Sequence, residues 1–197
     1  LIRNLNLGMR TIRELGAEPM PVGYAPDLFG HIAAMPTIFA GLGLCGAVVW
    51  RGLNNEQVAA QFVWVGPDGS RVLTHKLPDH IGYGWVGGSL RLPWRDASHD
   101  DAVLREKAPG ILAKERERSA VPLMYLSDAQ DHQPMPTRVP RMLEVLRETC
   151  PDIEFVHASI ADYFVELEAH QDELKEFRGE LRTPARKTGN LYHALIP

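Results

Sequence analysis

The amino-acid sequence predicts an α/β protein with a mainly parallel sheet, and three observations lead to that class. Segments with apolar residues at helical spacing alternate with short apolar runs that are typical of buried strands. One turn signal, Pro67-Asp68-Gly69, adds a single hairpin to this alternation. The length of 197 residues, with 45% hydrophobic residues, is sufficient for one domain with a sizeable core. Because strands that alternate with helices usually pair in parallel, we expect a mainly parallel sheet.

The first quarter of the chain is predicted to hold two helices and two strands. Apolar residues at helical spacing predict a helix over residues 1–15, which Gly16 ends. Residues 18–24 predict a short strand, and their prolines indicate a strand start or an edge. A helix closed by glycine is expected over residues 33–43. The apolar run 46–50 then predicts a buried strand.

The middle of the chain contains the hairpin, a long segment without periodicity and a charged helix. Residues 61–77 predict two strands around the turn. Residues 78–98 are rich in glycine and tryptophan and show no period, so we expect a long loop, which in a compact domain is usually functional or mobile. Residues 100–118 predict a charged helix that Pro109-Gly110 could interrupt.

The last part of the chain is predicted to hold two further strands and two helices. Residues 122–127 and 153–158 each form a short apolar run and predict buried strands. A helix is expected within residues 137–150. Another is expected over residues 159–177, because a serine–aspartate capping pattern opens it. From Arg178 onward the sequence is basic and irregular.

Composition excludes some classes of partner. A formal net charge of −4 and a sequence pI near 6.1 give no basic footprint for nucleic acid. No apolar run approaches the roughly 20 residues that span a bilayer, and no leader is visible, so a cytoplasmic protein without a membrane partner is expected. Cys45 and Cys150 are too few for a disulfide framework and predict two reduced core thiols.

Polar side chains follow the predicted strands, where ligands bind in parallel α/β folds. Two loops that carry carboxylates and one arginine therefore fall on the same predicted edge of the sheet. The residues at these positions are Asp27, His31, Arg51, Asp79, His80, Tyr83, Asp128, Asp131, His132, His157 and Ser159.

This pattern alone leaves several interpretations open. Two carboxylates that face one pocket suit glycoside hydrolysis, and carboxylates with histidines also suit a divalent metal. Asp27 is also compatible with a helix-cap or turn position, and Asp131 with a turn position. His31 is compatible with a structural role. Arg51 fits either a surface ion pair or a site.

Four motifs resemble one known family. "GYAPDLFGHIAAMPTIF" is similar to the Asp-x-Phe-Gly-His segment of glycoside hydrolase family 38, the α-mannosidases. "AVVWRG" looks like the strand that follows that segment. "LMYLSDAQDHQP" is similar to the Gly-x-Asp-His loop of bacterial members, with Ala129 where glycine is usual. "GELRTP" looks like the stretch that closes the catalytic domain.

The resemblance implies a retaining, zinc-dependent glycosidase that cleaves α-mannosidic linkages in a mannoside or oligosaccharide. Such an enzyme would have a role in mannose and carbohydrate metabolism. By its motifs, Asp27 matches the nucleophile and also a zinc ligand, and Asp131 matches the general acid/base. Arg51 matches an arginine that contacts the site, and Tyr83 a tyrosine that contacts the sugar. His31 belongs to the motif and receives no chemical role.

Two physical expectations accompany these roles. A retaining enzyme places its two carboxyl groups about 5–5.5 Å apart, which is our prediction for Asp27 and Asp131. A general acid must hold its proton near neutral pH, and the negative charge of neighbouring Asp128 would favour this for Asp131.

The resemblance also implies that residues 1–197 form a single α/β domain within a larger catalytic domain. Its β/α barrel would have seven strands in the full protein, with the first strand and the downstream helical and β domains outside this chain. Of the four zinc ligands of the family, only Asp27 is present, so we expect this chain alone to bind Zn²⁺ weakly and to be inactive. An open barrel edge would favour association into a homo-oligomer.

Two other functions are alternatives to the glycosidase. A metal-dependent carbohydrate deacetylase can use a similar fold, but it would require a ligand cluster such as His-x₃-His on one helix, which the sequence lacks. A non-catalytic carbohydrate-binding relative would use Tyr83, Trp85 and Trp94 as a sugar platform, although the two tryptophans also fit simple loop packing. The presence of both Asp27 and Asp131 argues against this second alternative.

Overall fold

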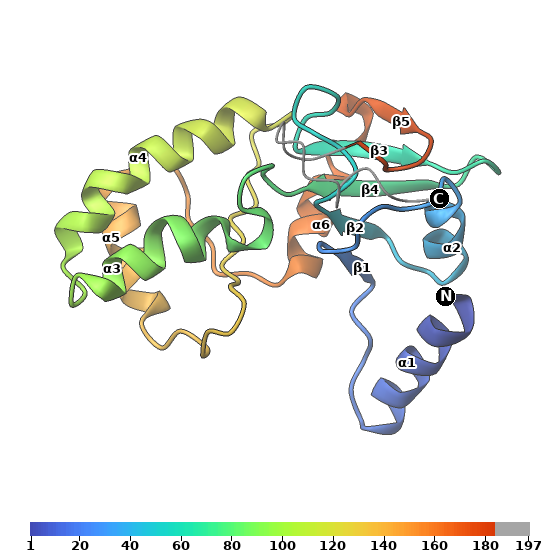
Figure 1. The fold of residues 1–197 in the computed structure, drawn as a ribbon, viewed down its shortest axis with the longest axis horizontal. Coiled ribbons are helices and arrows are strands. Elements are labelled where there is room, and N and C mark those ends of the chain that lie inside the picture. Colours follow the sequence, from blue (N-terminus) through green and yellow to red (C-terminus); the bar gives the residue numbers. More distant parts are fainter. Residues whose placement is uncertain (184–197) are drawn as a thin grey trace.

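Short runs of apolar residues build a five-stranded sheet in the computed structural model, which describes residues 1–183 (Figure 1). The strand order is β1-β2-β4-β3-β5, and every pairing is parallel except that of β3 with β4. The predicted α/β class and mainly parallel sheet are therefore confirmed. Among the described residues the sheet is open, with β1 and β5 at its edges. The strands are β1 Val22–Ala25, β2 Gly46–Val49, β3 Gln61–Val65, β4 Arg71–Lys76 and β5 Glu176–Arg178.

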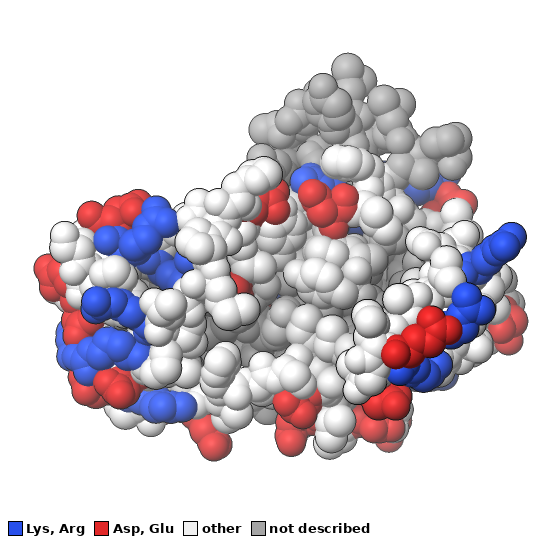
Figure 2. Space-filling view, turned by 90° about the horizontal axis from the view of Figure 1, so that it is seen from below, with Lys and Arg blue, Asp and Glu red and all other residues white. Residues whose placement is uncertain are grey.

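Six α-helices are described, and three of them form a lobe beside the sheet. Figure 1 shows α3, α4 and α5 together on the left, whereas α1 projects at the lower right. Figure 2, seen from below, shows charged side chains over this lobe and over α1, with mostly uncharged residues across the hollowed middle. The helices are α1 Ile2–Glu14, α2 Met35–Gly41, α3 Leu92–Asp96, α4 Asp101–Arg118, α5 Val139–Thr149 and α6 Ile160–Glu168.

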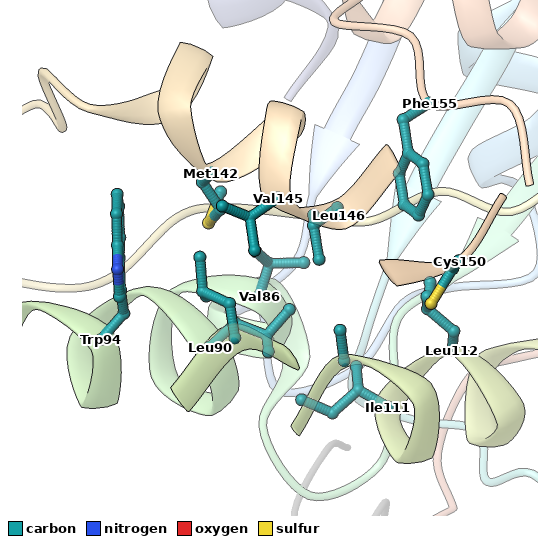
Figure 3. Close-up of a cluster of buried hydrophobic side chains, with 12 residues drawn as sticks. Val86, Leu90, Trp94, Ile111, Leu112, Met142, Val145, Leu146, Cys150 and Phe155 are labelled. Carbon is teal, nitrogen blue, oxygen red and sulfur yellow. The ribbon is translucent and has the colours of Figure 1, made fainter. Parts of the chain in front are cut away.

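The sheet is buried on both faces, as the continuous apolar run of β2 predicts. Successive side chains of a strand point to opposite faces. Ala47 and Val49 accordingly pack in one cluster with Phe39 of α2. Val48 packs in the other cluster with Phe164 of α6. A third cluster fills the lobe, where residues of α4 and α5 meet the segment 86–94 (Figure 3).

The hairpin and its turn are confirmed. β3 and β4 pair antiparallel, and a Gly66 N–H···O=C Ser70 bond of 2.8 Å closes the turn. The Asp68 carboxylate accepts hydrogen bonds from the Ser70 N–H at 3.0 Å and from the Thr37 hydroxyl at 2.6 Å. These bonds lower the pKa of Asp68 to about 2, the Thr37 bond contributing most.

The prediction of a long loop over residues 78–98 is wrong. This segment contains a short helical turn at Gly82–Gly84, a wider turn at Gly87–Arg91 and then α3. Its glycines have low helix propensity, which hides the pattern in the sequence. Packing stabilises it, because Leu90 and Trp94 are buried in the core of the lobe.

The expected interruption of the charged helix at Pro109-Gly110 is absent. α4 runs without a break from Asp101 to Arg118, and Asp100 caps its start through a bond to the Ala102 N–H. Pro109 and Gly110 are both exposed, so the backbone hydrogen bond that proline cannot donate is lost on the solvent side of the helix. The opposite side is anchored by buried side chains such as Leu104 and Leu112.

The two strands predicted over residues 122–127 and 153–158 are not observed. In the first segment, successive side chains nevertheless point alternately to two different cores. Leu123 and Tyr125 pack against the core that β2 shares with α6, whereas Met124 and Leu126 pack against the core of the lobe. The segment lies between two cores, and its apolar character reflects this burial.

The helix predicted over residues 159–177 is too long. Its capping box at Ser159 and Asp162 is confirmed, but α6 ends at Glu168. Residues 176–178 instead form β5, because the edge of β3 offers free backbone groups and the Val63 N–H donates to the Lys175 carbonyl at 3.0 Å. Isolated bridges at Leu181 and Thr183 follow, and the rest of the predicted irregular tail lies outside the described residues.

Two smaller findings concern cysteines and membranes. Cys150 is buried as expected, but Cys45 is exposed, so only one of the two is a core thiol. Within residues 1–183, every helix falls short of the length and apolarity that a membrane crossing requires.

Candidate active site

The register of two parallel strands brings Asp27 and Arg51 together. Ala25, the last residue of β1, pairs with Val49, the last residue of β2. Asp27 and Arg51 each lie two residues beyond these partners, so they leave the sheet at the same level. The Arg51 Nε lies 2.5 Å from the Asp27 carboxylate, with the arginine side chain 15% exposed and the aspartate 44% exposed. Because the Asp27 carboxylate is partly exposed and is held in place by the mostly buried Arg51, it can contact a substrate.

Aromatic rings fix the plane of the Arg51 guanidinium. Its central carbon lies 4.0 Å from the Trp50 ring centroid and 4.9 Å from that of Phe29. Such cation–π contacts are strongest with tryptophan and gain from partial burial. Trp50 is itself buried, and its indole N–H donates to the Asp79 carbonyl at 3.3 Å.

Tyr83 connects Asp131 to the Asp27–Arg51 pair. The Tyr83 hydroxyl forms a hydrogen bond with the Asp131 carboxylate and interacts electrostatically with Asp27 and Arg51. Burial first, and then this bond and the negative charges, raise the pKa of Tyr83 to about 12. The Tyr83 ring also lies edge-on to Trp50. The structure therefore brings together Asp27, Arg51, Tyr83 and Asp131, which the sequence placed after different predicted strands.

Backbone hydrogen bonds join the Tyr83 segment to the segment that carries Asp131. The Tyr83 carbonyl accepts from the Ala129 N–H at 3.1 Å and from the Ser127 hydroxyl at 2.9 Å. The Val86 N–H donates to the Ser127 carbonyl at 2.9 Å. These bonds hold the start of the Asp131 loop next to Tyr83.

Asp128 is paired with Arg91. Both of its carboxylate oxygens accept from the Arg91 Nε, at 2.7 and 3.0 Å. This ion pair is partly buried and compensates the negative charge of Asp128.

Asp79 has a structural role behind the site. Its carboxylate pairs with the fully buried ammonium of Lys76 and accepts from the Asn55 N–H at 3.1 Å. Lys76 also donates to the Asn55 side-chain oxygen at 2.7 Å. Burial lowers the pKa of Lys76 to about 8, although Asp79 opposes that shift. This group fixes the loop after β2, which carries Arg51.

Comparison with known proteins identifies the family of the chain. Residues 1–180 match the family model described as "Glycosyl hydrolases family 38 N-terminal domain". The chain belongs to this family.

Two relatives and one solved structure extend the comparison of this family 38 chain. A protein of Halalkalibacterium halodurans with the provisional name mannosylglycerate hydrolase is 28% identical over 92% of the chain and 20% of its own length. Alpha-mannosidase G of Dictyostelium discoideum is 27% identical over 91% of the chain and 16% of its own length. The chain thus spans about a fifth of these relatives or less. The crystal structure of an alpha-mannosidase from Enterococcus faecalis shares the fold, with a TM-score of 0.74 and 22% identity over 92% of this chain and 20% of that one.

The motif histidine of this family 38 chain lies in the core beneath the site. His31 is 5% exposed and lies edge-on to Trp64. Burial lowers the pKa of His31 to about 4, although a hydrogen bond with the Ala25 backbone opposes this shift. Its backbone forms two hydrogen bonds with Leu181, and its Nε2 has no hydrogen-bond partner among residues 1–183.

Three other residues that were predicted at this edge of the sheet lie outside the four-residue group. Ser159 caps α6, and His157 is exposed. His132 adopts a φ of 57° in the Asp131 loop and is exposed. No contact that the structure shows joins these three to Asp27 or Arg51.

The described residues do not by themselves provide a metal centre. Among residues 1–183, no group of three or more His, Cys, Asp or Glu side chains is arranged to hold an ion. Zinc sites normally take three or four protein ligands. Asp27, the one ligand that the family resemblance assigns, therefore does not complete a zinc site within this part of the chain.

Sequence reasoning missed one aromatic residue of this family 38 site. Trp50 contacts both Arg51 and Tyr83. A signal for Trp50 was available, because it ends an apolar strand directly before an arginine.

Proposed function

We propose that the full-length protein carrying this chain is a retaining glycoside hydrolase that cleaves α-mannosidic linkages. The observation that carries the proposal is the meeting of two carboxylates and one cation at Tyr83. Family membership and the names of the relatives support the same activity. The substrate class is a mannoside, including small mannosides such as an α-mannosyl glycerate.

In this mechanism Asp27 attacks the anomeric carbon, and Asp131 protonates the leaving-group oxygen. Arg51 orients the Asp27 carboxylate and compensates its charge until the covalent bond forms. Asp131 then takes a proton from the water that releases the sugar. Tyr83 holds the Asp131 carboxylate, and the exposed faces of Asp27 and Asp131 leave room for the sugar.

Zinc dependence is part of the proposal only for the full-length protein. There the ion would act as a Lewis acid toward sugar oxygens. Asp27 is the residue of this chain that would contribute to its site. Further ligands would lie outside the described residues, so weak zinc binding and inactivity of the isolated chain stay predictions.

The two alternatives receive less support. The carbohydrate deacetylase is less favoured because the family model that the chain matches is one of glycosyl hydrolases. The hypothesis of a non-catalytic carbohydrate-binding protein uses Trp94 as part of a sugar platform. However, Trp94 is 2% exposed and packs in the core of the lobe. Trp85 packs against the same core.

The finer structural expectations belong to the same proposal. We infer that the open sheet is part of a seven-stranded β/α barrel and that residues 1–197 form part of a larger catalytic domain. The cytoplasmic location and the self-association at the open sheet edge stay predictions.

Azide rescue tests the two roles separately. The full-length protein should release the leaving group from an activated aryl α-mannoside, and a chelator should suppress this release. Asp27→Ala should lose activity and, with azide, form the β-mannosyl azide, because azide then attacks in place of the carboxylate. Asp131→Ala with azide should form the α-mannosyl azide from the covalent intermediate. Hydrolysis that survives both substitutions, or the reverse stereochemistry, would refute the assignment.

A further inference from the structure

A pocket of about 200 Å³ lies beside the segment that carries Asp131, and none of the four site residues lines it. Its walls come from α3, from the start of α5 and from residues 133–138, which follow the Asp131 loop. Three arginines line this pocket together with His99. In the part of the chain that the structure describes, no Asp or Glu lines it. The arginines are Arg91, Arg95 and Arg138.

The three arginines differ in how far neighbouring acidic side chains compensate their positive charge. Arg91 is paired with Asp128 through its Nε alone. Arg95 pairs with Asp96 across a half-exposed contact and donates to the Gln133 side-chain oxygen at 2.7 Å. Arg138 is exposed and forms no ion pair with any residue of the described chain. The pocket therefore has an excess of positive charge.

Arg138 differs in this respect from three arginines elsewhere on the lobe, each of which has an acidic partner. Figure 2 shows Lys and Arg over the lobe of α3 to α5 interspersed with Asp and Glu. The ion pairs on this lobe include Arg105–Glu148, Arg116–Asp152 and Arg141–Asp101.

The start of α5 adds to the positive potential. Arg138 is the N-cap residue, and its side chain makes no capping hydrogen bond. The first N–H groups of a helix lack partners within the helix and favour a negative charge. Val139, the first residue of α5, lines the same pocket.

We propose that this pocket binds an anionic group, a carboxylate or a phosphate, on the leaving group of the mannoside. The inference rests on the proposed function, because a general acid protonates the leaving-group oxygen and the leaving group must then lie beside Asp131. Gln133, two residues after Asp131, lines the pocket. Arginine binds carboxylates and phosphates through two parallel hydrogen bonds. A half-exposed ion pair such as Arg95–Asp96 is weak enough to be exchanged for a ligand.

The test compares two substrates in the full-length protein. One is an α-mannosyl glycerate, whose leaving group carries a carboxylate, and the other is a neutral aryl α-mannoside. Arg138→Gln should lower the ratio of kcat/KM for the first over the second by about ten-fold or more, as expected for a lost charge-assisted hydrogen bond. Arg141→Gln is the matched control, because it removes the same charge from the same turn of α5 without lining the pocket. It should leave the ratio within about two-fold, the effect of an exposed ion pair. An equal ratio in wild type and Arg138→Gln would overturn the inference.

Inhibition separates the two anions. An inhibition constant of glycerate that rises in Arg138→Gln assigns the pocket to a carboxylate, and the same result with inorganic phosphate assigns it to a phosphate. If neither anion shows this dependence, the inference is wrong. If the wild-type protein does not hydrolyse the aryl α-mannoside at all, the proposed function fails. Calorimetric titration of glycerate and phosphate into the same variants then still decides whether the pocket binds anions.

Discussion

The ring of Trp50 lies edge-on to the ring of Tyr83, with their centroids 5.7 Å apart, and the backbone of Gly82 fills the space beside the indole. A Cβ on Gly82 would lie 2.3 Å from the Trp50 ring, and the φ of +56° at this position disfavours other residues. Trp50 also supports the Arg51 guanidinium. The site therefore depends on a residue that has no side chain.

Gly82→Ala should displace Trp50 and with it Arg51 and Tyr83. Small misplacements of catalytic groups are costly, so we expect kcat/KM for an aryl α-mannoside to fall roughly ten- to hundred-fold. Gly88→Ala is the control, because its Cβ would meet mainly the flexible end of Ile81. Equal activities of the two variants would contradict the role of Trp50.

Arg51→Lys should reduce activity although it keeps the positive charge. Lysine cannot reproduce the planar contact with the Trp50 and Phe29 rings or the fixed hydrogen bond from Nε to Asp27. We expect kcat/KM to fall about ten-fold or more. Arg71→Lys, at an exposed ion pair with Glu176 on the far strands, should change it by less than about two-fold. Full activity of Arg51→Lys would show that the positive charge alone is sufficient, and an equal loss in Arg71→Lys would assign the effect to the fold.

Tyr83→Phe should lower activity. The Tyr83 hydroxyl donates a hydrogen bond to the Asp131 carboxylate, and its loss removes a contact that positions this group. Small misplacements of catalytic groups are costly, so we expect kcat/KM for an aryl α-mannoside to fall about ten-fold. Activity equal to that of the wild type would contradict this role of Tyr83.

His31 should make the fold sensitive to acid between pH 6.5 and 4. Burial holds its pKa at about 4 in the folded protein, against an ordinary value of 6.5. In this window the unfolded chain binds the proton and the folded chain does not, so stability falls as the pH falls, by roughly 3 kcal/mol in total. Above pH 6.5 the contribution is fully present.

Thermal unfolding of wild type and His31→Gln at pH 7 and pH 5 tests this acid sensitivity. The wild-type midpoint should fall more between the two values than that of the variant, whatever the cost of the substitution itself. Parallel decreases would assign the acid sensitivity to other groups.

Gly110→Ala should stabilise the protein. Gly110 lies inside α4, is exposed, and a Cβ there would have no neighbour within 4 Å. Alanine in a helix interior is more favourable than glycine by about 0.5–1 kcal/mol. A rise of the thermal midpoint with unchanged kcat/KM is expected, and a fall would mean that Pro109-Gly110 needs the flexibility of glycine.

The sequence predicted the parts of the fold that local pattern determines. The alternation of helices and strands predicted the mainly parallel sheet. The Asp-x-Phe-Gly-His motif, together with the arginine after β2, indicated the Asp27–Arg51 pair. Three features depend on contacts that no local pattern carries. Burial in the lobe stabilises the helical turns of residues 82–96, two cores account for the apolar run 122–127, and the free edge of β3 turns residues 176–178 into a strand.

The bridges from Leu181 and Thr183 have a consequence for the order of folding. Leu181 exchanges two hydrogen bonds with His31, and Thr183 donates to the Gly52 carbonyl, so both site loops are tied to the far end of the described chain. Contacts between such distant segments form late, because a large loop must close first. During synthesis β1 to β4 and α2 can assemble early, but the loops of Asp27 and Arg51 become fixed only after residue 183 has left the ribosome. The two loops of the site would therefore be fixed later than the strands that carry them.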